Sequence, residues 1–311
     1  MKKTITKILS LALCLVCLFT LAACGGSASS DEAAPLTVAV PNDTTNEARA
    51  LLLLEALGYI TVDPNAGITA TIGDITENPY GLEFKEVEAA QIPNILQDVD
   101  FGVINSNYAI DAGINPAEDA LGIEGSASAY VNIVCVKEGN ENTDAAKALA
   151  AAVTSQKVAD YIAENYGGSV VTAVENPTDG YDASVDYAAL AGTTITVAAS
   201  PAPHAVILEL AAEILAEKDI TLEIKQFTDY VQPNLVVESG EIFANYFQHV
   251  PYLDDFNAEN DTHIVSIAGV HVEPMGNYGG KQTTLDVITA EKFDYPQTAG
   301  GLSAPAVFFN L

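Results

Sequence analysis

The chain has 311 residues and an acidic composition that argues against several classes of function. Lys and Arg number 12 and Asp and Glu number 42, so the formal net charge is −30 at pH 7. Binding to nucleic acid and electrostatic docking on anionic lipid both require clustered Lys and Arg, and this balance argues against each. Hydrophobic residues make up 49% of the chain, which excludes general disorder. A chain of this length is expected to form two domains or lobes.

The first part of the chain predicts an export signal over residues 1–23. Three lysines precede an apolar run from Ile8 to Leu21, which has the length of a signal-peptide core and is short for a transmembrane helix. The run ends in Leu-Ala-Ala-Cys, which resembles the lipobox of bacterial lipoproteins. We therefore expect cleavage before Cys24, lipidation of that cysteine, and a flexible Gly/Ser/Ala-rich tether over residues 24–35. A plain secretory signal is the alternative.

Cysteine usage agrees with an exported lipoprotein. Cys14 and Cys17 would leave with the signal and Cys24 would carry lipid, so Cys135 would be the one remaining thiol, without a disulfide partner. Cys135 lies in an apolar stretch over residues 130–136. This setting predicts a buried structural thiol and not a nucleophile.

After the tether, predicted strands alternate with predicted helices. Thr44 and Glu47 have the spacing of a capping box and predict a helix start. Thr143 is the predicted cap of one long Ala-rich helix over residues 143–166, which two glycines end. A connector rich in Pro, Gly and Asp spans residues 174–193. The predicted strands are 36–40, 82–87, 101–104, 130–136, 195–199, 220–227, 242–245 and 264–270, and the predicted helices are 44–57, 93–99, 143–166, 203–218 and 233–239.

The alternation predicts α/β architecture with largely parallel sheets. The two halves also resemble each other at an offset of 140 residues, where Leu-Glu-Phe-Lys at 82–85 aligns with Leu-Glu-Ile-Lys at 222–225. Two similar lobes predict a ligand cleft between them. We assign residues 36–137 to the first lobe and 138–288 to the second, with an aromatic segment over 227–253; residues 289–311 form an unassigned tail.

A lone arginine and two asparagines are the candidate polar contacts of that cleft. Arg49 is the only arginine in the chain and lies in the first turns of a predicted helix, at the carboxyl end of a strand. A guanidinium near a helix N-terminus suits a carboxylate. Asn105 and Asn132 lie near strand ends, and an amide can bind an ammonium or a carboxylate group. Together they suit a zwitterion. The alternatives are an arginine paired with Glu47 or Asp43, and asparagines that only form turns.

Aromatic side chains gather at a predicted junction between a strand and a helix. Such rings can line a mostly apolar pocket with a polar rim. Core packing is the alternative, most of all for Phe243 and Tyr246. The cluster comprises Phe243, Tyr246, Phe247, His249 and Tyr252, together with Tyr230 on the preceding loop.

No motif singles out a catalytic centre. The sequence has no G-x-S-x-G elbow, no P-loop and no H-E-x-x-H. His271-Val-Glu273 is a possible metal fragment, but His204, His249, His263 and His271 show no recognised ligand spacing, and exposed histidines at strand ends are the simpler interpretation. We predict no metal and no cofactor. A hydrolase that uses paired carboxylates is an alternative from another class.

Six stretches together resemble one family of exported proteins. They include P-N-D-T-T-N-E-A-R-A-L-L-L-L at 41–54 and F-Q-H-V-P-Y-L at 247–253. The stretches are similar to the NlpA/MetQ family, the methionine-binding lipoproteins of ABC importers, and the resemblance covers roughly residues 36–170 and 194–288. The six stretches are 38–54, 103–109, 128–132, 227–234, 245–253 and 271–276.

The resemblance implies a two-lobed, type II periplasmic-binding-protein-like fold with an interlobe ligand cleft. It implies a monomer anchored by lipid to the extracytoplasmic face of the cell membrane, without enzymatic activity, that passes methionine to an ABC permease and its ATPase. L-methionine is the expected ligand, and D-methionine is a second form to test. In the family pattern Arg49 holds the carboxylate and Asn105 and Asn132 bind the backbone polar groups. The thioether is surrounded by Tyr230, Phe247, His249 and Tyr252.

The order of the two halves departs from the family pattern. In the family, the segment with F-Q-H-x-P-Y-L precedes the segment with P-N-D…R, whereas here it follows. The chain therefore resembles a circular permutation, or a remnant of a tandem fusion that lost its outer pieces, in which the connector 174–193 joins the usual termini. We expect one interlobe crossover to be cut, leaving a single hinge near residues 136–142. Alternative ligands are another small amino acid or a methionine-containing dipeptide, and a surface lipoprotein that has lost binding is a further alternative.

Overall fold

The computed structural model describes residues 34–125, 130–290 and 306–307. From Pro35 onward the described chain belongs to one compact unit, which holds both lobes. The predicted signal peptide, Cys24, most of the tether and most of the tail 289–311 lie outside the described residues. In the part of the chain that is described, no helix combines the length and apolar character needed to cross a membrane.

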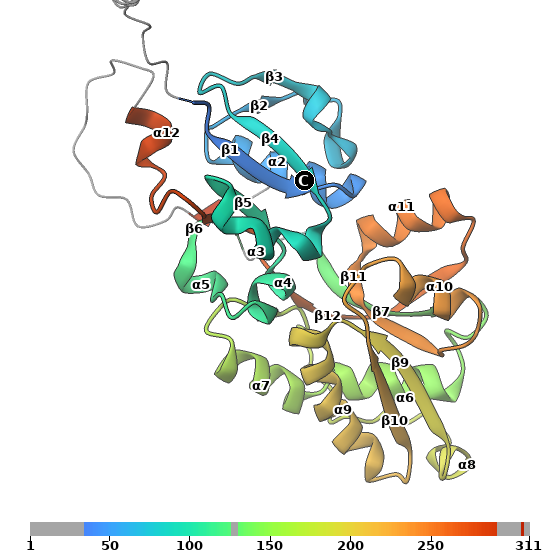
Figure 1. Ribbon diagram of the computed structural model, residues 1–311. Helices are drawn as coiled ribbons and strands as arrows, with labels where there is room; N and C mark the ends of the chain where they lie inside the picture. The colour runs from blue at the N-terminus through green and yellow to red at the C-terminus, as the bar shows by residue number, and fades with distance from the viewer. Residues whose placement is uncertain (1–33, 126–129, 291–305, 308–311) are drawn as a thin grey trace, which may run out of the picture. The chain divides into compact units, whose positions relative to one another are not determined.

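Two mixed six-stranded sheets form the framework of two lobes (Figure 1). The strands of the first sheet, in spatial order, are β14 (Ala306–Val307), β6 (Ala120–Glu124), β13 (Gly276–Gly279), β5 (Phe101–Ile104), β1 (Thr37–Pro41) and β4 (Glu83–Val87). Those of the second are β10 (Thr221–Gln226), β9 (Thr194–Ala199), β11 (Ala244–His249), β7 (Val131–Lys137), β12 (Ile264–Val272) and β8 (Val171–Thr172). A two-stranded sheet pairs β2 (Thr61–Val62) with β3 (Ile75–Glu77).

Helices connect the strands within each lobe. In the first lobe they are α2 (Thr44–Ala56), α3 (Ile92–Ile95), α4 (Ser106–Asp111), α5 (Pro116–Asp119) and α12 (Asp286–Ala290). In the second they are α6 (Asp144–Val153), α7 (Gln156–Asn165), α8 (Tyr187–Leu190), α9 (Val206–Ala216), α10 (Gln232–Glu238) and α11 (Val250–Asn260).

The predicted resemblance between the halves is confirmed by the strand order. Three parallel strands stand in the order β4-β1-β5 in the first sheet and β10-β9-β11 in the second. In each sheet the next strand, β13 or β7, runs antiparallel to its neighbours. The expectation of largely parallel sheets is therefore wrong for the ladders that β13 and β7 form, whereas β14 pairs with β6 in parallel. The reason is that β13 and β7 each enter from the other lobe and not through a crossover helix.

Among the described strands, the chain passes from one sheet to the other twice. It leaves the first sheet after Glu124 and enters the second at Val131, and it returns between Val272 and Gly276. The expected single hinge near residues 136–142 and the lobe boundary at 137 are wrong. Strand β7 lies between β11 and β12 and packs its apolar side chains into the second lobe, so it belongs to that lobe together with Asn132.

The long helix predicted over 143–166 is two helices. Thr143 caps α6, as predicted, by accepting a hydrogen bond from the Ala146 N–H at 3.3 Å. The helix ends at Val153, and the Ser155 hydroxyl caps α7 by accepting from the Val158 N–H. A serine can compete for backbone donors in this way, so it starts a new helix inside an otherwise helical run.

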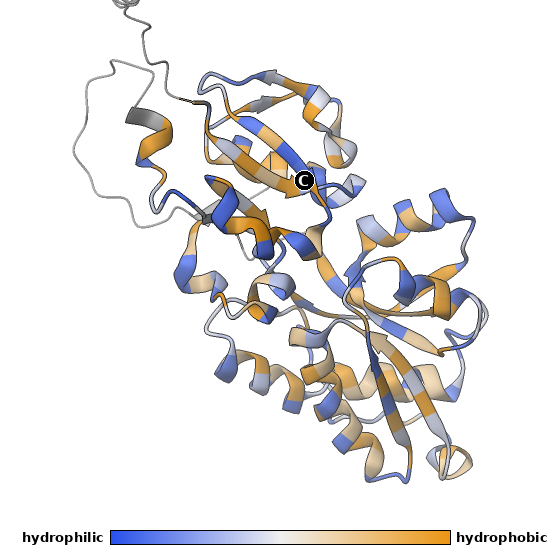
Figure 2. Cartoon of the chain, viewed as in Figure 1, coloured by the Kyte–Doolittle hydropathy of each residue, from blue (hydrophilic) through white to orange (hydrophobic). Residues whose placement is uncertain are grey.

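Each lobe has its own apolar core. The largest buried cluster lies in the second lobe between the sheet, α6 and α9, and two smaller ones lie against the first sheet. Figure 2 shows apolar residues along the strands and polar residues along the outer side of α7 and α11. Cys135 lies on β7 and is buried in a small apolar cluster, which agrees with the predicted structural thiol. Burial raises the pKa of this thiol.

Candidate functional site

Residues from both lobes line one small cavity between them. Its free space is about 20 Å³, little more than one water molecule requires, so the side chains of the two lobes nearly fill it. All seven residues predicted to contact a ligand line it. Its full lining is Asn46, Arg49, Asn105, Ser106, Asn107, Asn132, Tyr230, Phe247, Gln248, His249, Tyr252 and Glu273.

Arg49 reaches the cavity because α2 begins directly after β1. The cap of this helix is Asp43, whose carboxylate accepts from the Asn46 N–H at 3.1 Å, and not the predicted Thr44. Glu47 does not complete a capping box, because its carboxylate accepts from the Ile72 N–H at 2.8 Å. The helix then directs the Arg49 side chain, only 4% exposed, toward the other lobe.

Glu124 is the ion-pair partner of Arg49, in place of Asp43 or Glu47. Nε donates to Glu124 Oε1 at 2.8 Å and Nη2 to Oε2 at 2.6 Å, while Nη2 also donates to the Glu273 backbone oxygen at 2.7 Å. Burial alone would lower the pKa of Arg49, but the Glu124 carboxylate outweighs it and raises the pKa. Within the described ranges no hydrogen bond uses Nη1, so its two N–H groups are available to an anion.

Two asparagines from the first lobe present unpaired polar atoms at the cavity. Asn105 follows β5 and donates to Asn46 Oδ1 at 2.8 Å, but its own Oδ1 is buried without a partner. The Nδ2 of Asn107 is likewise buried and unpaired, while its Oδ1 accepts from the Tyr230 hydroxyl of the second lobe at 2.7 Å. A buried amide atom without a partner is costly, so these atoms favour a polar ligand.

An aromatic wall faces these polar groups from the second lobe. The ring centroids of Tyr230, Phe247 and Tyr252 lie 5.9–6.0 Å from one another. His249 closes the wall at the end of β11 and caps α11 by accepting from the Tyr252 N–H at 3.2 Å. Burial, with the charge of Arg49, lowers the pKa of His249 well below its usual value, so this ring is neutral at pH 7. Tyr246 packs in the core, as the core-packing alternative proposed.

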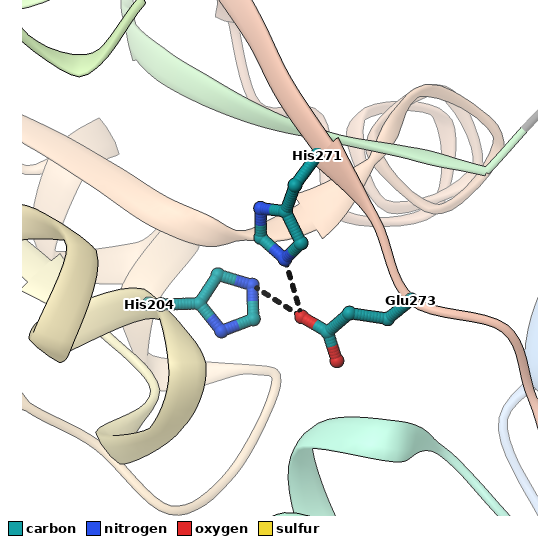
Figure 3. A group of neighbouring side chains, drawn as sticks. All are labelled: His204, His271 and Glu273. Carbon is teal, nitrogen blue, oxygen red and sulfur yellow. Dashed lines mark hydrogen bonds and ion pairs between the residues drawn. The ribbon is translucent and has the colours of Figure 1, made fainter. Parts of the chain in front are cut away.

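A buried group of His204, His271 and Glu273 lies beside the cavity (Figure 3). The expectation of exposed histidines is wrong for His204, His249 and His271, all buried, whereas the side chain of His263 is 56% exposed. Asn132 joins this group, because its Oδ1 lies 2.8 Å from His204 Nε2. The three ligand atoms lie within 4.8 Å of one another.

Sequence reasoning gave no role to Glu124, Tyr130 or Asn107, and it considered Glu273 only as part of a possible metal fragment. The Arg49 guanidinium carbon lies 4.3 Å from the centroid of the Tyr130 ring, and Glu124 neutralises the same group. Three of these four residues fall inside stretches that carry the family resemblance, which was a usable signal. Glu124 stands 75 positions from Arg49, and no local pattern reports such a pair.

Comparison with known proteins shows relatives that align with part of the chain. Membrane lipoprotein TpN32 of Treponema pallidum is 43% identical over 146 residues, covering 47% of this chain and 54% of that protein. The D-methionine-binding lipoprotein MetQ of Escherichia coli is 38% identical over 136 residues, covering 43% of this chain and 50% of that protein. The chain thus spans about half the length of the curated relatives that it matches.

Solved structures give similar partial matches. A nutrient-binding protein from Burkholderia cenocepacia bound to methionine is 46% identical, covers 32% of this chain and 43% of its own, and has a TM-score of 0.30. Lipoprotein Tp32 of Treponema pallidum is 43% identical, covers 45% and 58%, and has a TM-score of 0.42. The model of the NlpA lipoprotein family matches residues 33–174 and 195–292, which is well over half of the sequence. The chain therefore belongs to the NlpA lipoprotein family.

Proposed function

We propose that this protein is the substrate-binding lipoprotein of an ABC importer and that it binds free methionine in the interlobe cavity. The observation that carries the proposal is the opposition, in one buried space, of a guanidinium with unused donors and an aromatic wall. The printed names of relatives support the ligand class, since several are D-methionine-binding lipoproteins.

The polar end of the cavity suits the backbone groups of an amino acid. Nη1 of Arg49 supplies two donors for the carboxylate, and the bidentate bond to Glu124 holds the guanidinium in place. The unpaired Oδ1 of Asn105 can accept from an ammonium group, and Nδ2 of Asn107 can donate to the carboxylate. Asn132 lines the same end of the cavity, where its Oδ1 lies 2.8 Å from His204 Nε2.

The aromatic end suits a thioether. Sulfur against a ring edge is worth on the order of 0.3–1.5 kcal/mol for each contact. Tyr230, Phe247, His249 and Tyr252 present four rings to one small space, and none of them carries a charge at pH 7. This wall disfavours strongly polar side chains. The Tyr230 hydroxyl already donates to Asn107 Oδ1 across the lobes, so the lobes would have to open to admit the ligand and close again around it.

The cellular setting follows from the expected lipobox. Cys24 would carry the lipid that holds the protein at the extracytoplasmic face of the membrane, where it would pass methionine to a permease and its ATPase. We propose binding as a monomer, without a chemical step. The names of the relatives, which include membrane and outer membrane lipoproteins, support the anchored location.

We also propose that the halves are circularly permuted. Curated relatives each align with only 43–47% of this chain, as expected when a collinear alignment can follow one half at a time. The family model matches two segments that flank residues 175–194, close to the predicted connector. Both interlobe crossovers exist in this chain, so the reversed order need not alter the hinge.

A melting experiment tests the proposed ligand. The protein is purified through a denaturation and refolding step that strips bound ligand, and its midpoint is measured with each amino acid and with glycyl-methionine. Methionine at about 100 times its Kd should stabilise the native state by about 2.7 kcal/mol. A shift with another ligand alone would reassign the site. A cooperative melt that no ligand shifts would contradict the proposal and favour a surface lipoprotein without binding.

A further inference from the structure

Glu273 is a buried carboxylate in the cavity wall. It lies in the short crossover between β12 and β13 and is 5% exposed. The same residue provides the backbone oxygen that accepts from Arg49 Nη2 at 2.7 Å. Its side chain therefore stands next to the place where Arg49 would hold a ligand carboxylate.

One imidazole hydrogen-bonds this carboxylate, and a second, whose Nε2 is hydrogen-bonded to Asn132 Oδ1, lies beside it. His271 Nε2 lies 2.6 Å from Glu273 Oε1, and His204 Nε2 lies 3.3 Å from the same oxygen. The Tyr246 hydroxyl contacts Nδ1 of His271, which sets the proton of that ring on Nε2 and directs it to Glu273. Figure 3 shows the second carboxylate oxygen pointing away from both rings.

No cation balances this carboxylate from within the described part of the chain. Burial lowers the pKa of His204 and of His271 to about 3, so both rings are neutral at pH 7. Arg49 is neutralised by Glu124, and no lysine is paired with Glu273 among the described residues. Burial raises the pKa of Glu273, against the opposing effects of His204, of Arg49 and of the Asn107 backbone N–H. A buried carboxylate of this kind calls for a cationic group.

We propose that Glu273 binds the α-ammonium group of the ligand and makes the site specific for α-amino acids, with His271 as a positioning residue. This inference rests on the proposed function, because it assumes an amino-acid ligand in this cavity. The two subsites are adjacent, because Arg49 donates to the backbone oxygen of Glu273. This suits an α-amino acid, whose carboxylate and ammonium groups are attached to the same carbon. The ion pair with the ligand would be complete only when the cavity is occupied.

The same three side chains could be considered as ligands of a metal ion, but their spacing favours hydrogen bonds. Two ligands at about 2.0–2.2 Å from a tetrahedral zinc ion stand roughly 3.3–3.5 Å apart. The distance of 2.6 Å between His271 Nε2 and Glu273 Oε1 is that of a charge-assisted hydrogen bond. A metal ion would need both atoms to separate and both Nε2 protons to leave.

The test compares L-methionine with its α-hydroxy analogue, 2-hydroxy-4-(methylthio)butanoate, by calorimetry on the refolded protein. The analogue keeps the carboxylate and the thioether but lacks the ammonium. The wild type should bind methionine at least about tenfold more tightly than the analogue. Glu273→Gln should weaken methionine by about tenfold or more and leave the analogue unchanged or tighter, so that the preference disappears. Glu238→Gln is the matched control, since Glu238 also lies near a histidine but outside the cavity.

The outcomes separate the two proposals. If the wild type binds neither methionine nor any amino acid, the proposed function fails. If it binds methionine and the analogue equally, or if Glu273→Gln keeps the wild-type preference, the ammonium subsite is wrong while the proposed function stands. The comparison on the wild type requires no variant, so it decides the matter even where Glu273→Gln does not fold. Zn²⁺ alone is titrated in parallel, and binding that Glu273→Gln abolishes and that competes with methionine would assign the cluster to a metal ion instead.

Discussion

The Arg49–Glu124 pair should dominate both the stability of the unliganded protein and its binding of a carboxylate. The two side chains are 4% and 0% exposed and share two hydrogen bonds. Removing one partner leaves a buried uncompensated charge, so Arg49→Met or Glu124→Met should each lower the free energy of unfolding by roughly 3–5 kcal/mol. Replacing both by methionine removes both charges and keeps apolar volume. The double variant should therefore be more stable than either single variant, with a coupling energy of at least about 2 kcal/mol.

Urea denaturation followed by circular dichroism measures this cycle. The control cycle uses Lys157 and Glu213, whose side chains are 46% and 65% exposed, and there the coupling should stay below about 1 kcal/mol. Binding gives a second, independent readout. Methionine should raise the midpoint of Glu124→Met, which keeps the guanidinium, and should not raise that of Arg49→Met or the double variant. Additive losses of stability in the double variant, or methionine binding without Arg49, would refute the reasoning.

Three further results are expected. Burial lowers the pKa of His271 from 6.5 to about 3. Below pH 6.5 this ring is therefore protonated in the unfolded chain but still neutral in the native protein, so the free energy of unfolding decreases as the pH falls from 6.5 toward 3. At pH 5 this amounts to roughly 2 kcal/mol, and the loss of stability between pH 7 and pH 5 should be smaller by that amount in His271→Gln; an equal loss would show that the ring titrates normally. Tyr230→Phe removes the 2.7 Å hydrogen bond to Asn107 across the lobes, so calorimetry should show methionine binding weakened by about 2–10-fold, and an unchanged Kd would mean that this bond does not favour closure. Ser155→Ala removes the cap of α7 and should cost about 1 kcal/mol in urea denaturation, whereas no loss would place the helix start elsewhere.

Local sequence signals predicted most helices and strands. They failed at helix starts where more than one residue was able to cap the helix or where a cap lay inside a helical run. Strand β5 has the predicted bounds, 101–104, and Thr143 caps its helix as predicted. Next to Thr44, however, Asp43 can also cap a helix, and in the structure it is the Asp43 side chain that accepts from the Asn46 N–H. Ser155 inside an Ala-rich run looked like one helical residue among many, and it starts a second helix.

The sequence alone determined the family, the α/β lobes with their repeated strand–helix–strand unit, and the residues at the two ends of the cavity, Arg49 and the aromatic segment. These features depend on short motifs and on periodicity, which report neighbours along the chain. Only the tertiary structure decided that β7 belongs to the second lobe, that Glu124 pairs with Arg49, and that Glu273 stands in the cavity wall beside two neutral histidines. Each of these depends on contacts formed where the chain crosses between two sheets. Arg49 meets the backbone of Glu273 at a separation of 224 residues, and the burial that sets the charge state of this group exists only after both lobes have folded around it.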